Sequence, residues 1–230
     1  MIATVSLALA TLAFVGSHLA LSHPYRLALV GRMGEQLFLA FYSLVAIATL
    51  AWMVFAWRSI DNSVAWWVAP DWAWWVASGV MLVASVLLAG SLVRNPALPH
   101  PGARPRIPAA PKGVYAITRH PMNWSFILWA LAHLAVWGSP RNVIVAVGIL
   151  VLAVAGSIGQ DRKKADMLGP PWLQWMERTS FVPFGAVLAR KVKARAAVPG
   201  AVALGGGFVF WLAVTWFHAP DAQPLRLLIP

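Results

Sequence analysis

Three histidines stand in or beside long apolar runs of the chain, where an ionisable side chain is costly unless something satisfies it. His120 lies just before the run of residues 122–138 and His133 lies within it, while His18 lies near the end of the run of residues 2–21. Imidazole nitrogen is a common ligand of metal ions and of haem iron, and facing helices can supply two such ligands. We therefore consider His18 and His133 as a pair of metal ligands. The alternative is that each ring makes a hydrogen bond across a helix interface.

Helical rise predicts that these two histidines lie at different depths. His133 is eleven residues beyond Met122, which corresponds to about 16 Å of rise. His18 is about three residues, or about 4.5 Å, from the end of its own run. His120 is predicted to be closer in level to His18. Whether His18 or His120 pairs with His133 therefore stays open at the level of sequence.

The polar segment that opens the run at 122–138 reads Arg119-His120-Pro121. Proline is favoured at the first helical position, and the positive N-terminus of a helix beside an arginine is a place for an anion or a polar headgroup. Asn123 lies three residues after His120, on the same predicted face, where it could orient the ring. The alternative is that Arg119 only anchors the helix at the membrane surface.

The composition of the chain determines the class of protein that carries these residues. Of its 230 residues, 60% are hydrophobic and 11% are charged, and the mean hydropathy is +0.70. Soluble domains are roughly 45–50% apolar, so the chain is predicted to lie in a bilayer. The net charge of +11 is explained by basic cytoplasmic loops, and we do not expect nucleic acid as a partner. The absence of cysteine excludes disulfides, thiolate ligands and covalently attached haem.

Six apolar runs have about the 20 residues that an α-helix needs to cross roughly 30 Å of hydrocarbon. The runs are approximately 2–21, 36–57, 72–93, 122–138, 142–159 and 198–217. We predict an all-α fold, a polytopic membrane helical bundle of about six transmembrane helices. The bundle is predicted to form a single integral membrane domain over residues 1–230.

Basic residues are distributed unevenly between the two sides of this bundle. The segments 22–35, 94–121 and 160–197 carry 2, 5 and 8 Lys and Arg residues, whereas the other side carries 3. By the positive-inside rule these three segments face the cytoplasm, and both termini lie on the non-cytoplasmic side. Many tryptophans fall near the opposite, outer ends of the runs, which is typical of an aromatic belt.

The chain that follows the fifth run is predicted to continue as a helix up to the glycine and prolines of residues 169–171, which stop it. Asp161 in this helix is expected to form a local ion pair with its neighbour Arg162. A short helix follows, in which Trp172 and Trp175 belong to a stripe with spacing i, i+3, i+4, i+7. We predict that this stripe lies along the inner membrane surface.

Several short segments form a combination that is fairly specific, although each segment alone is weak. They are Gly31-Arg32-Met33-Gly34-Glu35, Phe41-Tyr42-Ser43-Leu44, Thr118-Arg119-His120-Pro121, Leu131-Ala132-His133 and Asp161-Arg162. The combination resembles the NnrU-like membrane proteins, which include the plant and cyanobacterial 15-cis-zeta-carotene isomerases. On this resemblance the NnrU-like core covers about residues 2–184, and the run at 198–217 is an additional C-terminal transmembrane helix.

The resemblance implies a multi-pass protein of the inner (cytoplasmic) membrane. In the isomerase branch it implies haem b, with iron held by His18 and His133, and redox-dependent isomerisation of the central cis double bond of a carotene. Arg119, His120 and Asn123 would then hold the haem propionates or gate the cytoplasmic mouth. In the bacterial branch it implies a role linked to nitrite and nitric oxide metabolism during denitrification. The expected partners are the lipid bilayer and a lipophilic or small-molecule substrate.

One position departs from the isomerase pattern. The plant isomerases carry a cysteine, implicated as an alternative ligand, three residues before the second histidine, and this chain has Ala130 there. A switch to a thiolate ligand is therefore impossible here. Ligation by two histidines survives this change, because haem b needs no bond to cysteine.

A second and more distant resemblance supports an alternative function. This chain has Arg119-His120-Pro121, followed by an acid and then by Trp172, Trp175, Arg178 and Pro183. The isoprenylcysteine carboxyl methyltransferases have a similar layout. That resemblance implies a membrane methyltransferase that binds S-adenosylmethionine at its cytoplasmic face. Those enzymes usually have paired glutamates where this chain has Gln160-Asp161, which disfavours methyl transfer. A third alternative is a non-enzymatic membrane scaffold.

Overall fold

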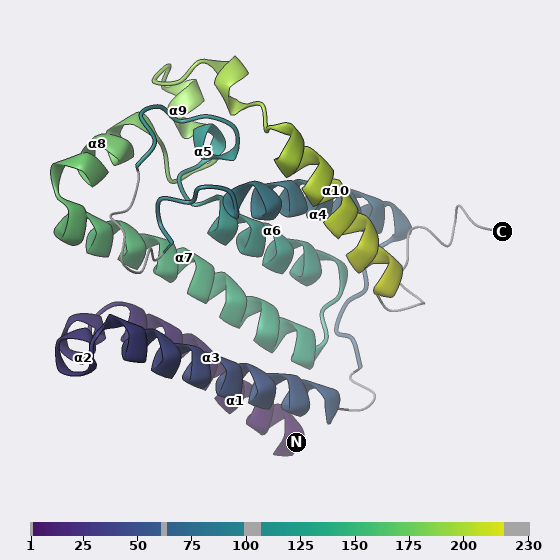
Figure 1. The fold of residues 1–230 in the computed structure, drawn as a ribbon. Helices are drawn as coiled ribbons and strands as arrows, with labels where there is room; N and C mark the ends of the chain where they lie inside the picture. Colours follow the sequence, from purple (N-terminus) through teal and green to yellow (C-terminus); the bar gives the residue numbers. More distant parts are fainter. Residues whose placement is uncertain (1, 61–63, 99–106, 219–230) are drawn as a thin grey trace.

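The computed structural model describes residues 2–60, 64–98 and 107–218, and these residues form a helical bundle (Figure 1). Within these ranges the regular structure is helical, apart from an isolated bridge between Val68 and Trp137. The prediction of an all-α fold is confirmed. The elements are α1 (Ile2–Ser22), α2 (Arg26–Met33), α3 (Glu35–Arg58), α4 (Asp71–Ser91), α5 (Val114–Ile117), α6 (Pro121–Val136), α7 (Pro140–Leu168), α8 (Pro170–Arg178), α9 (Gly185–Leu188), a 3₁₀ turn (Ala194–Ala197) and α10 (Ala201–Phe217).

Four of these helices, α1, α3, α4 and α7, are long and apolar enough to cross a membrane. The chain is therefore a multi-pass membrane protein by the length and composition of its helices. Helices α6 and α10 are also apolar but have 16 and 17 residues, and 16 residues rise only about 24 Å. Each of the six predicted runs thus corresponds to a helix, whereas the number of six spans and the orientation of the termini stay predictions.

Helix α7 lies between two groups of helices (Figure 1). On one side it packs against α1, which pairs with α3, and on the other side it packs against α6, which pairs with α4 and through it with α10. Gly148 allows the close approach of α7 to α1, because an added Cβ atom would lie 2.3 Å from Thr11 Cγ2. Small residues permit this kind of contact between membrane helices. Helix α7 therefore faces both halves of the bundle.

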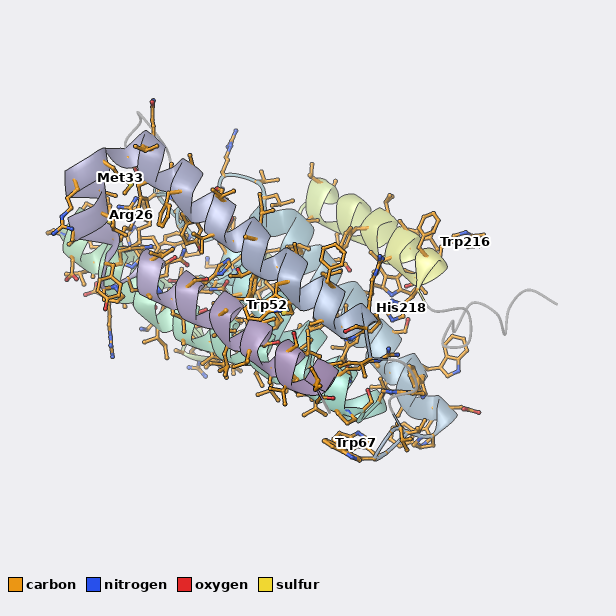
Figure 2. The ribbon with its side chains drawn as sticks, turned by 90° about the horizontal axis from the view of Figure 1, so that it is seen from below. Arg26, Met33, Trp52, Trp67, Trp216 and His218 are labelled. Carbon is orange, nitrogen blue, oxygen red and sulfur yellow. The ribbon has the colours of Figure 1, made fainter. Side chains whose placement is uncertain are left out.

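The two ends of the bundle differ in their side chains. Arg26 and Met33 lie at one end, which we call the basic end, and Trp67 and Trp216 lie at the other (Figure 2). At the tryptophan end the indole of Trp67 donates to the carbonyl of Leu134 at 2.9 Å. This separation follows the uneven distribution of basic residues in the sequence.

A buried cluster covers the basic end of α7. Helix α7 ends at Leu168, as predicted, because Gly169 takes a positive φ of 61° that glycine adopts easily and a proline follows. The side chains of Trp172 and Trp175 are 0% and 2% exposed, and they pack with Tyr115 in a core formed by α5, α8, α9 and the neighbouring turns. The prediction that this stripe lies along the membrane surface is wrong. The helical period identified an apolar face correctly, but protein covers that face.

Candidate functional site

A network of polar side chains lies where α6 begins against α7. The segment before α6 is fixed by the chain around Phe181: the amide of Arg119 donates to the carbonyl of Ser180 at 2.9 Å, and Thr118 Oγ1 donates to the carbonyl of Phe181 at 2.7 Å. Pro121 opens α6, as predicted. These contacts place His120 at the helix start with its ring directed towards α7, and its side chain is fully buried.

Asp161 of α7 joins the two neighbouring side chains of this segment. Its Oδ2 atom accepts from Arg119 Nε at 2.8 Å and lies 2.6 Å from a second guanidinium nitrogen, while His120 Nε2 lies 3.0 Å from Oδ1. The expected pair between Asp161 and Arg162 is wrong, because successive helical residues point about 100° apart and Arg162 is exposed. The carboxylate instead binds two side chains of the segment that precedes α6.

The second nitrogen of His120 faces Gln160. Gln160 Nε2 donates to the carbonyl of Ala97 at 3.3 Å, which directs its Oε1 atom towards His120 Nδ1 at 3.2 Å. Both ring nitrogens of His120 therefore lie within hydrogen-bond distance of an oxygen atom, one of Gln160 and one of Asp161.

Asn123 lies one turn further into α6 than His120. Its side-chain amide donates to Ser157 Oγ at 2.7 Å, and that hydroxyl donates to the carbonyl of Ala153 at 2.7 Å. Gln160 and Asp161, rather than Asn123 as expected, thus orient the ring of His120. Asn123 ties α6 to α7.

A small cleft borders this network. Its volume is about 30 Å³, room for about one water molecule. It is lined by Asn95, Ala97, Leu98, Arg119, His120, Pro121, Met122, Asn123 and Gln160. Phe181 lies edge-on to the ring of His120, with 5.7 Å between ring centroids, and the guanidinium of Arg119 lies 5.9 Å from the centroid of Phe181. The arrangement provides fixed hydrogen-bond donors beside a space for a water molecule or a small polar group.

His18 and His133 lie outside this network and share one local geometry. Nδ1 of His18 lies 2.8 Å from the carbonyl of Phe14, and Nδ1 of His133 lies 2.8 Å from the carbonyl of Trp129, four residues earlier in each case. A proton on Nδ1 makes this hydrogen bond and leaves the Nε2 lone pair to bind a metal ion. Each histidine is thus prepared to act as a ligand.

The structure does not bring His18 and His133 to the same level. The carbonyl of His133 accepts from Asn142 Nδ2 at 3.0 Å, near the start of α7. In α1, Thr11 lies against Gly148 and the loop residue His23 lies against Gly159, so His18 is level with the residues between these two glycines. This is about ten residues, or about 15 Å, further along α7 than His133. The difference in depth predicted from helical rise is present.

His120 is further still from His133 along α7, because it contacts residues 160 and 161 of that helix. Both of its ring nitrogens already have partners, so neither is free to bind a metal ion. The neighbour of His133 is instead His218, with 6.0 Å between ring centroids. Among the described residues, no group of three or more His, Cys, Asp or Glu side chains could hold a metal ion. Haem iron needs only one or two axial ligands from the protein.

Comparison with known proteins identifies the family. A family model described as NnrU protein matches residues 6–222. The chain belongs to the NnrU family. The match extends the NnrU-like region well beyond residue 184, where the resemblance in sequence placed its end, and includes α10.

Two curated relatives of this NnrU-family chain carry a name that describes an activity. The chloroplastic 15-cis-zeta-carotene isomerase of Zea mays is 29% identical over 90 residues, which are 39% of this chain and 25% of the relative. The enzyme of the same name from Arabidopsis thaliana is 30% identical over 84 residues, 36% of this chain and 23% of the relative. The chain thus matches about a quarter of the length of these relatives. No solved structure matches the chain.

Sequence reasoning missed most of the partners of His120. Ser157, Gln160 and Asp161 recur with spacing i, i+3, i+4 in α7, and Lys164 continues this spacing to i+7. Such a polar stripe in an otherwise apolar helix is a signal of a buried interface. It was available in the sequence, but it identifies no partner helix.

Proposed function

We propose that this NnrU-family chain is an isomerase-type membrane enzyme of the inner (cytoplasmic) membrane, and that its substrate is a lipophilic, carotene-like polyene. The observation that carries the proposal is the family match over residues 6–222, together with two relatives named 15-cis-zeta-carotene isomerase. The apolar bundle supports it, because a polyene dissolves in the hydrocarbon that surrounds these helices.

Haem b is the cofactor that we propose for this enzyme, and its redox change is the chemistry that it would supply. The free Nε2 atoms of His18 and His133 fit axial ligation, and the absence of cysteine fits a noncovalently bound haem. The backbone positions that carry the two rings differ in level by about 15 Å along α7, which disfavours one iron held by both. We therefore propose that a single histidine of this pair holds the iron.

The network around Asp161 has a positioning role in this proposal. Arg119 and His120 are already bonded to Asp161, so a haem propionate would have to replace a carboxylate that is 2.6 Å from Arg119. In the described arrangement these residues fix the start of α6, which is the helix that carries His133. The cleft beside them, at about 30 Å³, is about a tenth of the smallest usual ligand site of about 300 Å³. This size disfavours the alternative of S-adenosylmethionine binding there.

An absorption spectrum tests the cofactor. Full-length protein purified from haem-replete cells is expected to show a Soret band. His18→Ala and His133→Ala, compared with each other, are expected to give one variant that loses or shifts the band and one that keeps it. Loss in both variants would contradict ligation by a single histidine, and the absence of a band from the wild type would refute haem binding.

The activity is tested with purified protein in lipid vesicles that contain 15-cis-zeta-carotene. We expect the isomer ratio, followed by chromatography and absorption, to change faster with one redox state of the protein than with the other. Vesicles without protein are the control. An isomer ratio that stays at the control value with both reduced and oxidised protein would refute the proposed activity.

A further inference from the structure

A second group of ionisable side chains lies at the basic end, where α2 and the loop after α1 meet α7. Lys164 is 5% exposed, and among the residues that the structure describes no carboxylate lies within ion-pair distance of its ammonium group. Arg26 and Glu35 act on Lys164 electrostatically, with opposite sign. In both views α2 lies at the same end of the bundle as the C-terminal part of α7 (Figures 1 and 2).

Two further cations share this corner. The guanidinium-bearing side chain of Arg26 is 11% exposed and lies 5.4 Å from the ring centroid of Phe38. Lys163 donates from Nζ to the carbonyl of Ser22, the last residue of α1, at 3.2 Å. Arg26 and Lys164 both act on Lys163 as like charges. The three cations are held close together although they repel each other.

Glu35 offsets this charge only in part. Its carboxylate pairs with Arg26 at 3.1 Å, but its side chain is 44% exposed, and an exposed pair contributes little. Three cationic side chains therefore face one carboxylate. Like charges held together repel each other, so an anion bound beside Arg26, Lys163 and Lys164 would stabilise the fold.

The pKa of His23 is also affected by positive charge at this end of the bundle. Its ring lies against Gly159 of α7, and its Nδ1 atom is buried without a hydrogen-bond partner among the described residues. Burial lowers the pKa of His23, and the nearby ammonium of Lys163 lowers this pKa further. A buried polar atom without a partner thus belongs to a ring close to Lys163.

We propose that Arg26, Lys163 and Lys164 form a binding site for a phosphodiester, and that the occupant is the headgroup of an anionic phospholipid. The site lies at headgroup level, because the carbonyl that Lys163 contacts belongs to the last residue of the apolar helix α1. The 29 residues of α7 extend about 43 Å, past roughly 30 Å of hydrocarbon. Basic pockets between membrane helices at this level bind anionic lipid headgroups.

The neighbouring surface favours a lipid over free phosphate. Leu27 follows Arg26 in α2 and is 73% exposed, and Leu37 near the start of α3 is 60% exposed. Such apolar side chains beside the cations can contact acyl chains, which free phosphate does not have. This proposal is independent of the proposed isomerase activity, because none of its residues belongs to the network of Asp161 or to the pair His18 and His133.

The test compares full-length wild-type protein with Lys164→Met in nanodiscs of neutral phosphatidylcholine, with and without phosphatidylglycerol. In neutral lipid the variant is expected to have the higher Tm, because one of three mutually repelling charges has been removed. Phosphatidylglycerol is expected to raise the Tm of the wild type more than that of the variant. In native mass spectrometry the variant is expected to retain phosphatidylglycerol roughly fivefold more weakly, since each basic side chain near an anionic surface contributes about 1 kcal/mol.

Arg162→Met is the matched control, because it removes a charge from an exposed position two residues away, and it is expected to keep the wild-type response to phosphatidylglycerol. Lys163→Met is a second variant of the site and is expected to lose part of that response. An equal gain of Tm in wild type and Lys164→Met would overturn the proposal, since it would reflect a general surface effect. In neutral nanodiscs, inorganic phosphate alone is expected to give no gain; a full gain of Tm would overturn the assignment to a lipid.

Discussion

Helix α7 carries two buried ionisable side chains one turn apart, Asp161 and Lys164, and their surroundings differ. Asp161 has two partners within hydrogen-bond distance, the guanidinium of Arg119 and the imidazole of His120, and the second ring nitrogen of His120 faces Gln160. Lys164 has like charges as neighbours and a carboxylate that acts on it only at a distance. The first group is satisfied within the chain, whereas the second requires something from outside. Burial of a charge therefore indicates a structural role in one place and a binding site in the other.

Removal of the satisfied carboxylate is expected to have the largest effect. Asp161→Ala leaves Arg119 and His120 buried without their shared partner, and breaking such a pair costs roughly 3–5 kcal/mol. The free energy of unfolding in a detergent or bilayer titration measures this loss. Asp166→Ala, at an exposed position of the same helix, is the control and is expected to change stability little. An equally small effect of Asp161→Ala would show that the network does not stabilise the fold.

A neutral contact of the same network is expected to have an intermediate effect. Ser157→Ala removes the acceptor of Asn123, which is partly buried beside the water-sized cleft, so we expect a loss of about 1 kcal/mol. Asn123→Ala is the comparison, because Ser157 then keeps its bond to the carbonyl of Ala153. We expect Ser157→Ala to lower the unfolding free energy more than Asn123→Ala does. The reverse order would contradict the assigned direction of these hydrogen bonds.

The smallest effect on stability is expected beside Arg26, Lys163 and Lys164, where Glu35 is the nearby carboxylate. Glu35→Gln removes the carboxylate that offsets Arg26, and because this carboxylate is partly exposed the loss should stay within about 1 kcal/mol. The corner becomes more positive, so retention of phosphatidylglycerol over phosphatidylcholine should increase in the variant. Native mass spectrometry measures the ratio, and Glu177→Gln is an exposed acidic control. A decrease in the ratio would mean that Glu35 itself contributes to lipid binding.

The helices could be predicted from the sequence because their signals are local. Apolar runs determine where helices form, Pro121 determines where α6 begins, and Gly169 determines where α7 ends. The stripe of Trp172 and Trp175 also follows from local spacing. What covers that stripe does not, because a helical period gives the direction of a face but not the nature of its partner.

The site could be predicted only in part. Arg119 and His120 were identified because they stand at a helix start, and the difference in level between His18 and His133 follows from helical rise. The partner of Asp161 could not be found this way, because its neighbour in sequence points elsewhere and the residues that bind it are about 40 positions away. Pairings between helices depend on how α6 and α7 pack, which no local pattern encodes.

The seam between α1 and α7 has a consequence for the order in which the chain is assembled. Helices α1 and α3 are neighbours in sequence and can pair soon after synthesis, whereas the partner of Thr11 is Gly148, made much later. Domains and hairpins made early generally fold first. The face of α1 that packs on α7 therefore stays uncovered until α7 is made, and a side chain larger than glycine at residue 148 would obstruct the joining of the two halves.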